Sequence, residues 1–242
     1  MIKVDNIFKS FNNKEVLKGV SLEIPDKKIT VILGGSGSGK SVLIKHIMGL
    51  MTPDKGSIYV DGEDITKLNS KEMVRIRKKF GLLFQYSALF DSMSVRENIA
   101  FPLKEHTKLK DKEIDKIIAE KLGLVGLSGI EKMNPSDLSG GMRKRVALAR
   151  AIVLEPSIIV YDEPTSGLDP LMASTVDELI VETQKKLDIT TIVISHDIPA
   201  AFRIADNIVI VFEGEIVANG KPEDVKKSTN EYVQKFLKVG LR

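Results

Sequence analysis

A glycine-rich stretch, Gly34–Ser41, limits the folds open to this chain more than any other feature. It reads GGSGSGKS and fits the pattern G-x-x-x-x-G-K-[ST], between the apolar run Ile29–Leu33 and the periodic apolar segment Val42–Leu50. A strand, a glycine-rich turn and a helix in this order form a loop whose backbone N–H groups cradle phosphates. A flexible Gly/Ser turn is the alternative, but the flanking patterns favour a nucleotide site. Its predicted phosphate-binding residues are Gly34, Gly35, Ser36, Gly37, Ser38, Gly39, Lys40 and Ser41.

Within this phosphate loop, two side chains have separate predicted roles. Lys40 is placed to reach the β- and γ-phosphates as a point charge, and the Ser41 hydroxyl is placed to ligate Mg²⁺. ATP and Mg²⁺ are therefore the expected ligands.

The rest of the chain alternates short β-branched runs with longer helical patterns, which indicates an α/β fold with a mostly parallel core sheet. An amphipathic helix is expected over Met172–Leu187, and the tail Pro222–Leu241 is expected to be helical. The segments Ile2–Phe8 and Val20–Ile24 alternate better and suggest an antiparallel β flank. Further core strands are expected at Ile158–Tyr161, Thr190–Ile194 and Asn207–Phe212.

The middle of the chain, about residues 86–155, has helical periodicity and almost no strand signal, including Asp111–Leu122 and Gly140–Leu154. We expect an inserted helical lobe there. The chain is then a single domain, 1–242, with a core formed by residues 1–85 and 156–242.

Composition narrows the function classes. The chain has 36 Lys+Arg and 33 Asp+Glu, a net charge of +3, which is too small to argue for nucleic acid. It has no cysteine, which excludes disulfides, thiolate zinc sites and cysteine nucleophiles. No run approaches the roughly 20 apolar residues of a membrane span, and the start has no secretory pattern. A cytoplasmic protein is expected, brought to a membrane only by a partner.

Two further strands end in polar residues. The run Ile158–Tyr161 leads to Asp162 and Glu163, and a carboxylate in this place completes the Mg²⁺ site of phosphate-loop proteins. Asp162 is the predicted metal residue, and Glu163 is predicted to polarise the attacking water. His196 follows a parallel core strand, where the ligand crevice of such a sheet lies, and could hydrogen-bond the γ-phosphate. A structural imidazole is the alternative there, and it is our interpretation of His46 and His106.

The segment Leu138–Met142 (LSGGM), which we call the signature segment, resembles the signature motif of ABC-type ATPases, normally LSGGQ. The resemblance covers essentially the whole chain, with its motifs in family order. It implies that Ser139, Gly140 and Gly141 bind the ATP held by a second copy, so that a homodimer encloses two ATP.

Other residues acquire roles from the same resemblance. Phe11 matches the aromatic that stacks on adenine, with an ordinary core phenylalanine as the alternative. Gln85 matches the loop glutamine that touches Mg²⁺ and couples to the transport partner. Asp169, in SGLD, matches the loop that crosses the dimer interface, and His196 matches the switch histidine. Lys40, Gln85, Glu163 and His196 are thus the implied catalytic set.

Met142 departs from the family motif, but the backbone and Ser139 donors remain. The sequence around it, with residues 85–93 and 101–107, is similar to the ATPases of bacterial Mla-type (Mce-associated) phospholipid transporters. This similarity implies membrane permease subunits, an Mce-type lipid-binding protein and a place on the inner face of the cytoplasmic membrane. The alternatives are the ATPase of an amino-acid or other small-solute importer, and a non-transport ABC protein such as a cell-division regulator.

For two surface features, the sequence is consistent with two different interpretations. Leu89, Phe90 and Met93 fit either a groove for a helix of the permease or packing within the helical lobe. The basic run Arg75–Lys79 fits either lipid head groups or a solvated helix face.

Overall fold

The computed structural model describes residues 1–241, so Arg242, at the end of the expected domain, lies outside the described residues. The strands form two sheets, one of order β2-β1-β4-β5 and one of order β10-β9-β3-β8-β7-β6. The strand bounds are β1 Ile2–Phe11, β2 Lys14–Ile24, β3 Ile29–Leu33, β4 Lys55–Val60, β5 Glu63–Asp64, β6 Phe80–Leu83, β7 Ile158–Asp162, β8 Thr190–Ser195, β9 Asn207–Phe212 and β10 Glu215–Gly220.

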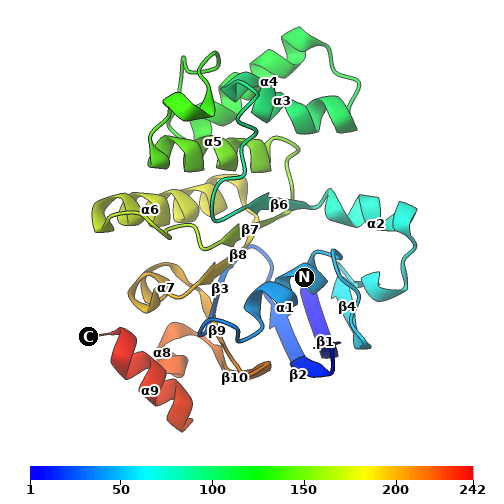
Figure 1. The fold of residues 1–242 in the computed structure, drawn as a ribbon, viewed down its shortest axis with the longest axis vertical. Coiled ribbons are helices and arrows are strands. Elements are labelled where there is room, and N and C mark those ends of the chain that lie inside the picture. Colours follow the sequence, from blue (N-terminus) through cyan, green and yellow to red (C-terminus); the bar gives the residue numbers. More distant parts are fainter. Residues whose placement is uncertain (242) are drawn as a thin grey trace.

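The helices cover both faces of the second sheet and form a separate lobe (Figure 1). Their bounds are α1 Lys40–Ile47, α2 Ser70–Arg77, α3 Val95–His106, α4 Asp111–Leu124, α5 Gly140–Ile152, α6 Pro170–Leu187, α7 Ile198–Ile204, α8 Pro222–Lys226 and α9 Glu231–Gly240. None of the helices within residues 1–241 is long and apolar enough to cross a lipid bilayer.

The predicted α/β class is confirmed. Strands β9, β3, β8, β7 and β6 pair in parallel, whereas β10 pairs antiparallel with β9 at the edge. The first sheet is antiparallel, as its alternating sequence predicts, and β4 and β5 extend it. Helices α3, α4 and α5 lie together at the top of Figure 1, beyond the edge of the sheet that ends in β6 and β7.

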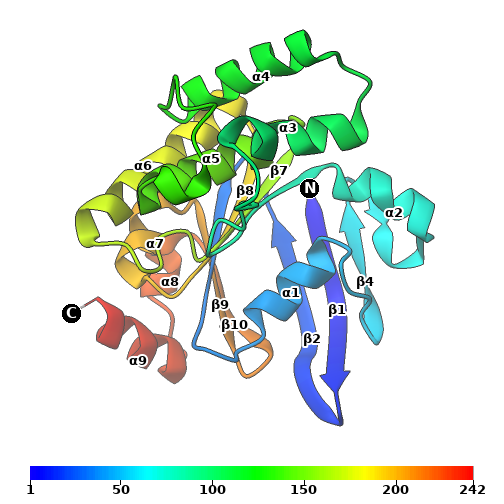
Figure 2. The same ribbon diagram turned by 45° about the horizontal axis from the view of Figure 1, so that its top comes forward.

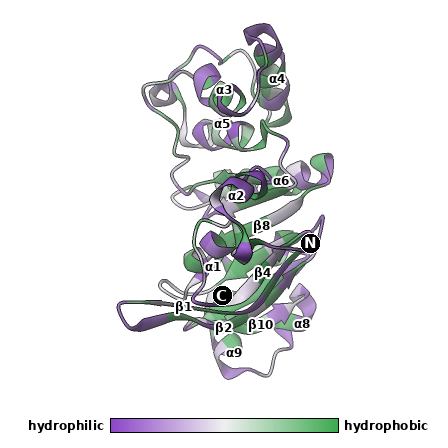
Figure 3. Cartoon of the chain, turned by 90° about the vertical axis from the view of Figure 1, so that its right-hand side faces the viewer, coloured by the Kyte–Doolittle hydropathy of each residue, from purple (hydrophilic) through white to green (hydrophobic). Residues whose placement is uncertain are grey.

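The hydrophobic core lies on both faces of the parallel sheet. Alternate residues of β3 serve opposite faces: Ile32 packs with α1 and the first sheet, whereas Val31 and Leu33 pack on the side of α6, α7 and the helical lobe. Helix α1 therefore lies between the two sheets (Figure 2), which fixes the direction in which its first residues point. In Figure 3 the apolar colour is concentrated in the strands, and the lobe helices show polar and apolar faces.

The C-terminal tail differs from the expected continuous helix. It forms the short helix α8 and, after a break, the helix α9, whose N-terminus is capped by the Asn230 side chain through the Val233 N–H at 3.1 Å. Asparagine favours the cap position because its side-chain oxygen satisfies a helix N–H without a helical backbone.

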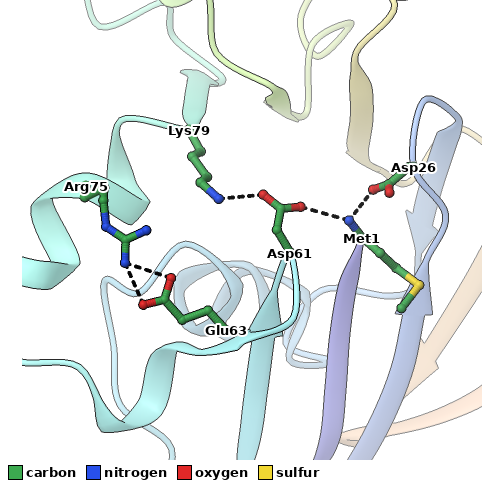
Figure 4. Close-up of polar contacts among 6 residues, drawn as sticks. All are labelled: Met1, Asp26, Asp61, Glu63, Arg75 and Lys79. Carbon is green, nitrogen blue, oxygen red and sulfur yellow. Dashed lines mark hydrogen bonds and ion pairs between the residues drawn. The ribbon is translucent and has the colours of Figure 1, made fainter.

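The basic run Arg75–Lys79 is tied to neighbouring loops (Figure 4). Arg75 pairs with Glu63 at 2.6 Å, and Lys79 pairs with Asp61 at 2.6 Å. Arg77 donates to the carbonyl of Gly49 at 2.7 Å. These contacts tie α2 and β6 to the first sheet and to the end of α1, while Arg75, Arg77 and Lys78 stay exposed, which favours a solvated helix face over lipid head groups.

Candidate nucleotide-binding and hydrolysis site

The strand register brings three predicted motifs to one edge of the sheet. Leu33 of β3 lies opposite Ser195 of β8, and Ile194 of β8 lies opposite Asp162 of β7. The phosphate loop follows β3, Asp162 ends β7 with Glu163 directly after it, and His196 follows β8. Residues far apart in the sequence therefore meet where open parallel sheets bind their ligands.

The phosphate loop has backbone geometry that favours glycine at several of its positions. A Cβ atom on Gly34 would lie 2.3 Å from the carbonyl oxygen of Val211, so no side chain fits there. Gly37 has φ +75°, a conformation that favours glycine. The Gly214 N–H, from the β9–β10 turn, donates to the Ser38 carbonyl at 3.1 Å and braces the loop from outside.

Lys40 is nearly buried at the start of α1, and its ammonium group donates to the carbonyls of Gly34 at 2.7 Å and Gly35 at 2.9 Å. Burial lowers the pKa of Lys40, while attraction by Glu163 and Asp162 acts in the opposite direction. Burial also disfavours the charged form of Asp162 and so raises the pKa of its carboxyl, and Lys40 and Lys45 oppose that shift. Lys40 and the two acids therefore form a partly buried, charge-complementary cluster.

Glu163 is held in an unusual backbone conformation. Its φ is +49°, which is uncommon for a residue with a side chain. The Glu163 N–H donates to the Ile194 carbonyl at 3.0 Å, and Oε2 of Glu163 lies 2.6 Å from Nδ1 of His196. Strain of this kind persists where the surroundings determine the geometry, and it gathers at active sites. The two predicted catalytic side chains are thus brought into direct contact.

The predicted metal residues fit Mg²⁺. Ser41, Asp162 and Gln85 offer hydroxyl, carboxylate and amide oxygens, the donors that this hard cation prefers. Within residues 1–241, no group of three or more His, Asp or Glu side chains could hold a metal on its own. Protein Mg²⁺ sites commonly use one or two side chains and complete their shell with phosphate oxygens and water. Gln85 is held toward the Glu163 loop, because its Nε2 donates to Ser166 Oγ at 3.1 Å.

The signature segment forms the N-terminus of α5. The Ser139 hydroxyl caps this helix by accepting from the Met142 N–H at 3.2 Å, and Gly140 and Gly141 begin it. A Cβ atom on Gly141 would lie 2.2 Å from Cε of Met172, so α5 packs closely on α6 here, and a larger residue would require the flexible end of the Met172 side chain to move. The Met142 side chain packs against the lobe core, an apolar position in which an amide is not needed. A helix N-terminus with exposed N–H groups suits an anion.

Two further predicted residues lie at the periphery. Asp169 caps α6 by accepting from the N–H groups of Leu171 and Met172, each at 3.0 Å. Phe11 ends β1 and is 41% exposed, which rules out the alternative of an ordinary core phenylalanine. The Lys9 ammonium lies 5.6 Å from the centre of the Phe11 ring.

Two cations of α5 that the sequence analysis did not single out contact the functional loops. Arg150 donates to the carbonyls of Ser87 at 2.9 Å and Ala88 at 2.8 Å, and both of these residues have positive φ. Lys144 donates to the carbonyls of Pro164 and Ser166. In the sequence both belong to an ordinary basic helix, and only the position of the neighbouring loops distinguishes them.

The chain matches the family model described as ABC transporter over residues 17–166, and it therefore belongs to the ABC transporter family. It is an ATP-binding cassette of that family. A dimeric ATP-binding cassette in a post-hydrolysis state with ADP and phosphate has the same fold, with a TM-score of 0.83 and 31% identity over 92% of this chain and 99% of that one.

Two curated relatives are close in sequence. The probable ribonucleotide transport ATP-binding protein mkl of Mycobacterium tuberculosis is 46% identical over 98% of this chain, which spans 66% of the length of the mycobacterial protein. The intermembrane phospholipid transport system ATP-binding protein MlaF of Haemophilus influenzae is 40% identical over 98% of this chain and 90% of that protein.

Proposed function

We propose that this cassette hydrolyses ATP to ADP and phosphate and thereby drives a membrane permease, in phospholipid transport between membranes. The observation that carries the proposal is the contact of Glu163 with His196 at the sheet edge that also bears the phosphate loop. A base, a hydrogen-bonding imidazole and a phosphate cradle together have the chemistry that phosphoryl transfer to water needs.

In this proposal, each of the site residues has a separate role in ATP hydrolysis. The N–H groups of the phosphate loop and the Lys40 ammonium bind the β- and γ-phosphates. Glu163 orients a water molecule and accepts its proton as the oxygen attacks the γ-phosphorus. His196 holds Glu163 in place and contacts the γ-phosphate. Mg²⁺ bound by Ser41, Asp162 and Gln85 would neutralise charge on the phosphate oxygens.

The working unit in this proposal is a homodimer in which ATP lies between the phosphate loop of one copy and the signature segment of the other. Two features support it: a second anion-binding helix terminus in each chain, at Ser139–Gly141, and the dimeric state of the cassette with the same fold. ATP then binds the closed dimer far better than the open one, and this difference in affinity supplies the drive. Phe11, on the exposed β1 tip, stacks on adenine, and Asp169 lies at the dimer interface.

A permease contact is supported by an apolar hollow beside the Gln85 loop. It has a volume of about 440 Å³ and is lined by Phe84, Phe90, Phe101 and Arg150, among others. The three aromatic side chains are exposed, whereas Leu89 packs on the lobe core. Exposed aromatics around a hollow are typical of protein interfaces. The permease would hold the cassette on the inner face of the cytoplasmic membrane.

The phospholipid cargo rests on the similarity to MlaF, the ATP-binding protein of an intermembrane phospholipid transport system. A partner of the Mce type, which binds the lipid, follows from the same similarity. The alternative cargo is a small polar solute, which the name of the mycobacterial relative, a ribonucleotide transport protein, favours.

The experiment that tests the proposal is affinity purification from detergent-solubilised native membranes, with mass spectrometry of the proteins and lipids that co-purify. Co-purification of a polytopic permease, a single-span Mce-type protein and phospholipid is the expected result. A permease with a soluble solute receptor would overturn the lipid cargo, and the absence of any membrane partner would overturn transport. ATP turnover by the purified chain, measured separately, tests hydrolysis itself.

A further inference from the structure

Lys144 is a buried lysine in the helical lobe whose charged group reaches out of the lobe to the loop that follows Glu163. It lies on α5, two residues beyond the signature segment, and is only 7% exposed. The ammonium group donates to the carbonyl of Pro164, the residue next to Glu163, and to the carbonyl of Ser166 at 3.2 Å. Lys144 therefore joins the helix of the signature segment to the loop of the base.

The same loop is also held from the Gln85 side. Ser166, whose carbonyl accepts from Lys144, accepts a second hydrogen bond at its hydroxyl from Gln85 Nε2 at 3.1 Å. Ser166 thus connects Gln85 to Lys144 through hydrogen bonds, and Lys144 in turn lies on the helix that begins with the signature segment.

A second buried lysine of the lobe shows what is unusual about Lys144. Lys121 is 4% exposed, and its ammonium pairs with the carboxylates of Glu120 at 3.0 Å and Glu155 at 2.9 Å. Within residues 1–241, Lys144 has no carboxylate partner, and burial lowers its pKa. A buried ammonium without an opposite charge is costly, and here only two carbonyl dipoles offset that cost. An apolar side chain of the same length would fill this space without that cost, so packing alone does not explain a lysine at position 144.

We propose that Lys144 is a positioning residue for hydrolysis: it holds the Pro164–Ser166 loop so that Glu163 faces the attacking water, and it ties that placement to the signature segment. This inference rests on the proposed ATPase function. Removal of the ammonium frees two carbonyls and lets the loop shift, while the phosphate loop, which binds the nucleotide, remains intact.

The test compares Lys144→Met, Lys144→Arg and the matched control Lys121→Met in the full chain. For each protein we would measure kcat and KM for ATP, the Kd of a fluorescent ATP analogue, and thermal unfolding. We expect Lys144→Met to lower kcat by about 10- to 100-fold, since a misplacement of about 1 Å at an active site has effects of that size. The Kd of Lys144→Met for the ATP analogue should stay within about twofold of the wild-type value, because the phosphate-loop contacts that bind the nucleotide before the reaction are unchanged. Lys144→Arg, which keeps the charge and the donors, should recover most of kcat, and Lys121→Met should hydrolyse ATP at the wild-type rate.

Three results would overturn the proposal: wild-type kcat in Lys144→Met, parallel losses of kcat and ATP binding, or an equal loss of kcat in Lys121→Met. If Lys144→Met does not fold, Lys144→Gln replaces it, and the same loss of kcat at unchanged Kd is expected. The proposed function fails in a different way, since the wild-type chain would then show no ATP turnover at all.

Discussion

The imidazole Nδ1 of His196 lies 2.6 Å from Oε2 of Glu163, although the two residues follow different strands of the sheet. Most of the imidazole surface is exposed, whereas the Glu163 side chain is largely covered. One side of His196 therefore fixes the carboxylate, and the other side is free to meet a phosphate oxygen.

Glu163→Gln should separate hydrolysis from binding. Glutamine has the shape of glutamate but cannot accept the proton of the attacking water, so ATP turnover should fall by about 10²- to 10⁴-fold. ATP affinity should be unchanged, and a stable dimer should form in ATP, seen as a shift in light scattering after size-exclusion chromatography. Turnover at the wild-type rate would refute the role of Glu163 as the base.

Lys40→Ala should remove nucleotide binding. The ammonium of Lys40 is the cation that the phosphate loop offers to the β- and γ-phosphates, and alanine leaves the loop without it. A ligand that binds only the folded state raises the unfolding temperature. We expect Mg-ATP to raise the Tm of the wild type and to leave that of Lys40→Ala unchanged. An equal rise in both proteins would show that Lys40 does not bind the phosphates.

Gly34→Ala should destabilise the fold, whereas Gly35→Ala should not. The added methyl on Gly34 would lie 2.3 Å from the Val211 carbonyl oxygen, while no atom lies within 4 Å of the same position on Gly35. Overpacking of a tight site costs about 1–3 kcal/mol. The free energy of unfolding from urea titrations checks this difference. Equal stability of the two variants would show that the loop moves away from β9 without cost.

The Asp61–Lys79 pair should contribute stability only above acidic pH. The hydrogen bond from Lys79 holds the pKa of Asp61 below its usual value. A carboxyl whose pKa is lowered by folding contributes stability above its unfolded pKa, about 3.9, and that contribution is lost as pH falls through the lower folded value. The pair is half-exposed, so the effect of Asp61→Asn at pH 7 should be below about 1 kcal/mol. Urea titrations from pH 7 into the acid range should show that the difference in free energy of unfolding between the wild type and Asp61→Asn becomes smaller. A difference that stays constant with pH would contradict this role of the pair.

Much of the parallel core was predictable, because strands buried on both faces are continuous apolar runs and their motifs lie at their ends. Asp162, Glu163 and His196 could be placed at one edge of the sheet from this rule alone. The short strand β6 was missed, since Phe80–Leu83 has too few residues for a periodic signal. Strand β10 was missed for another reason: it is an edge strand with no fully buried residue, and the apolar run in its sequence EIVANG is only three residues long.

Tertiary contacts explain what the sequence could not reveal about the site. The contacts that Lys144 and Arg150 make with the Pro164–Ser166 and Ser87–Ala88 carbonyls depend on which loop lies beside which helix. The sequence around a lysine in a basic helix looks the same whether its ammonium group lies in solvent or against two carbonyls.

The position of Lys144 has a consequence for the timing of the reaction. In the proposed dimer, Glu163 serves the ATP of its own copy, whereas Ser139 of the same chain touches the ATP of the other. If that dimer forms, the link from α5 to the Glu163 loop would make the active site of each copy respond to the ATP bound by the other. The two ATP molecules are then not consumed independently, and a mixed dimer with one Lys144→Met copy should lose the coordination between its halves as well as speed in one of them.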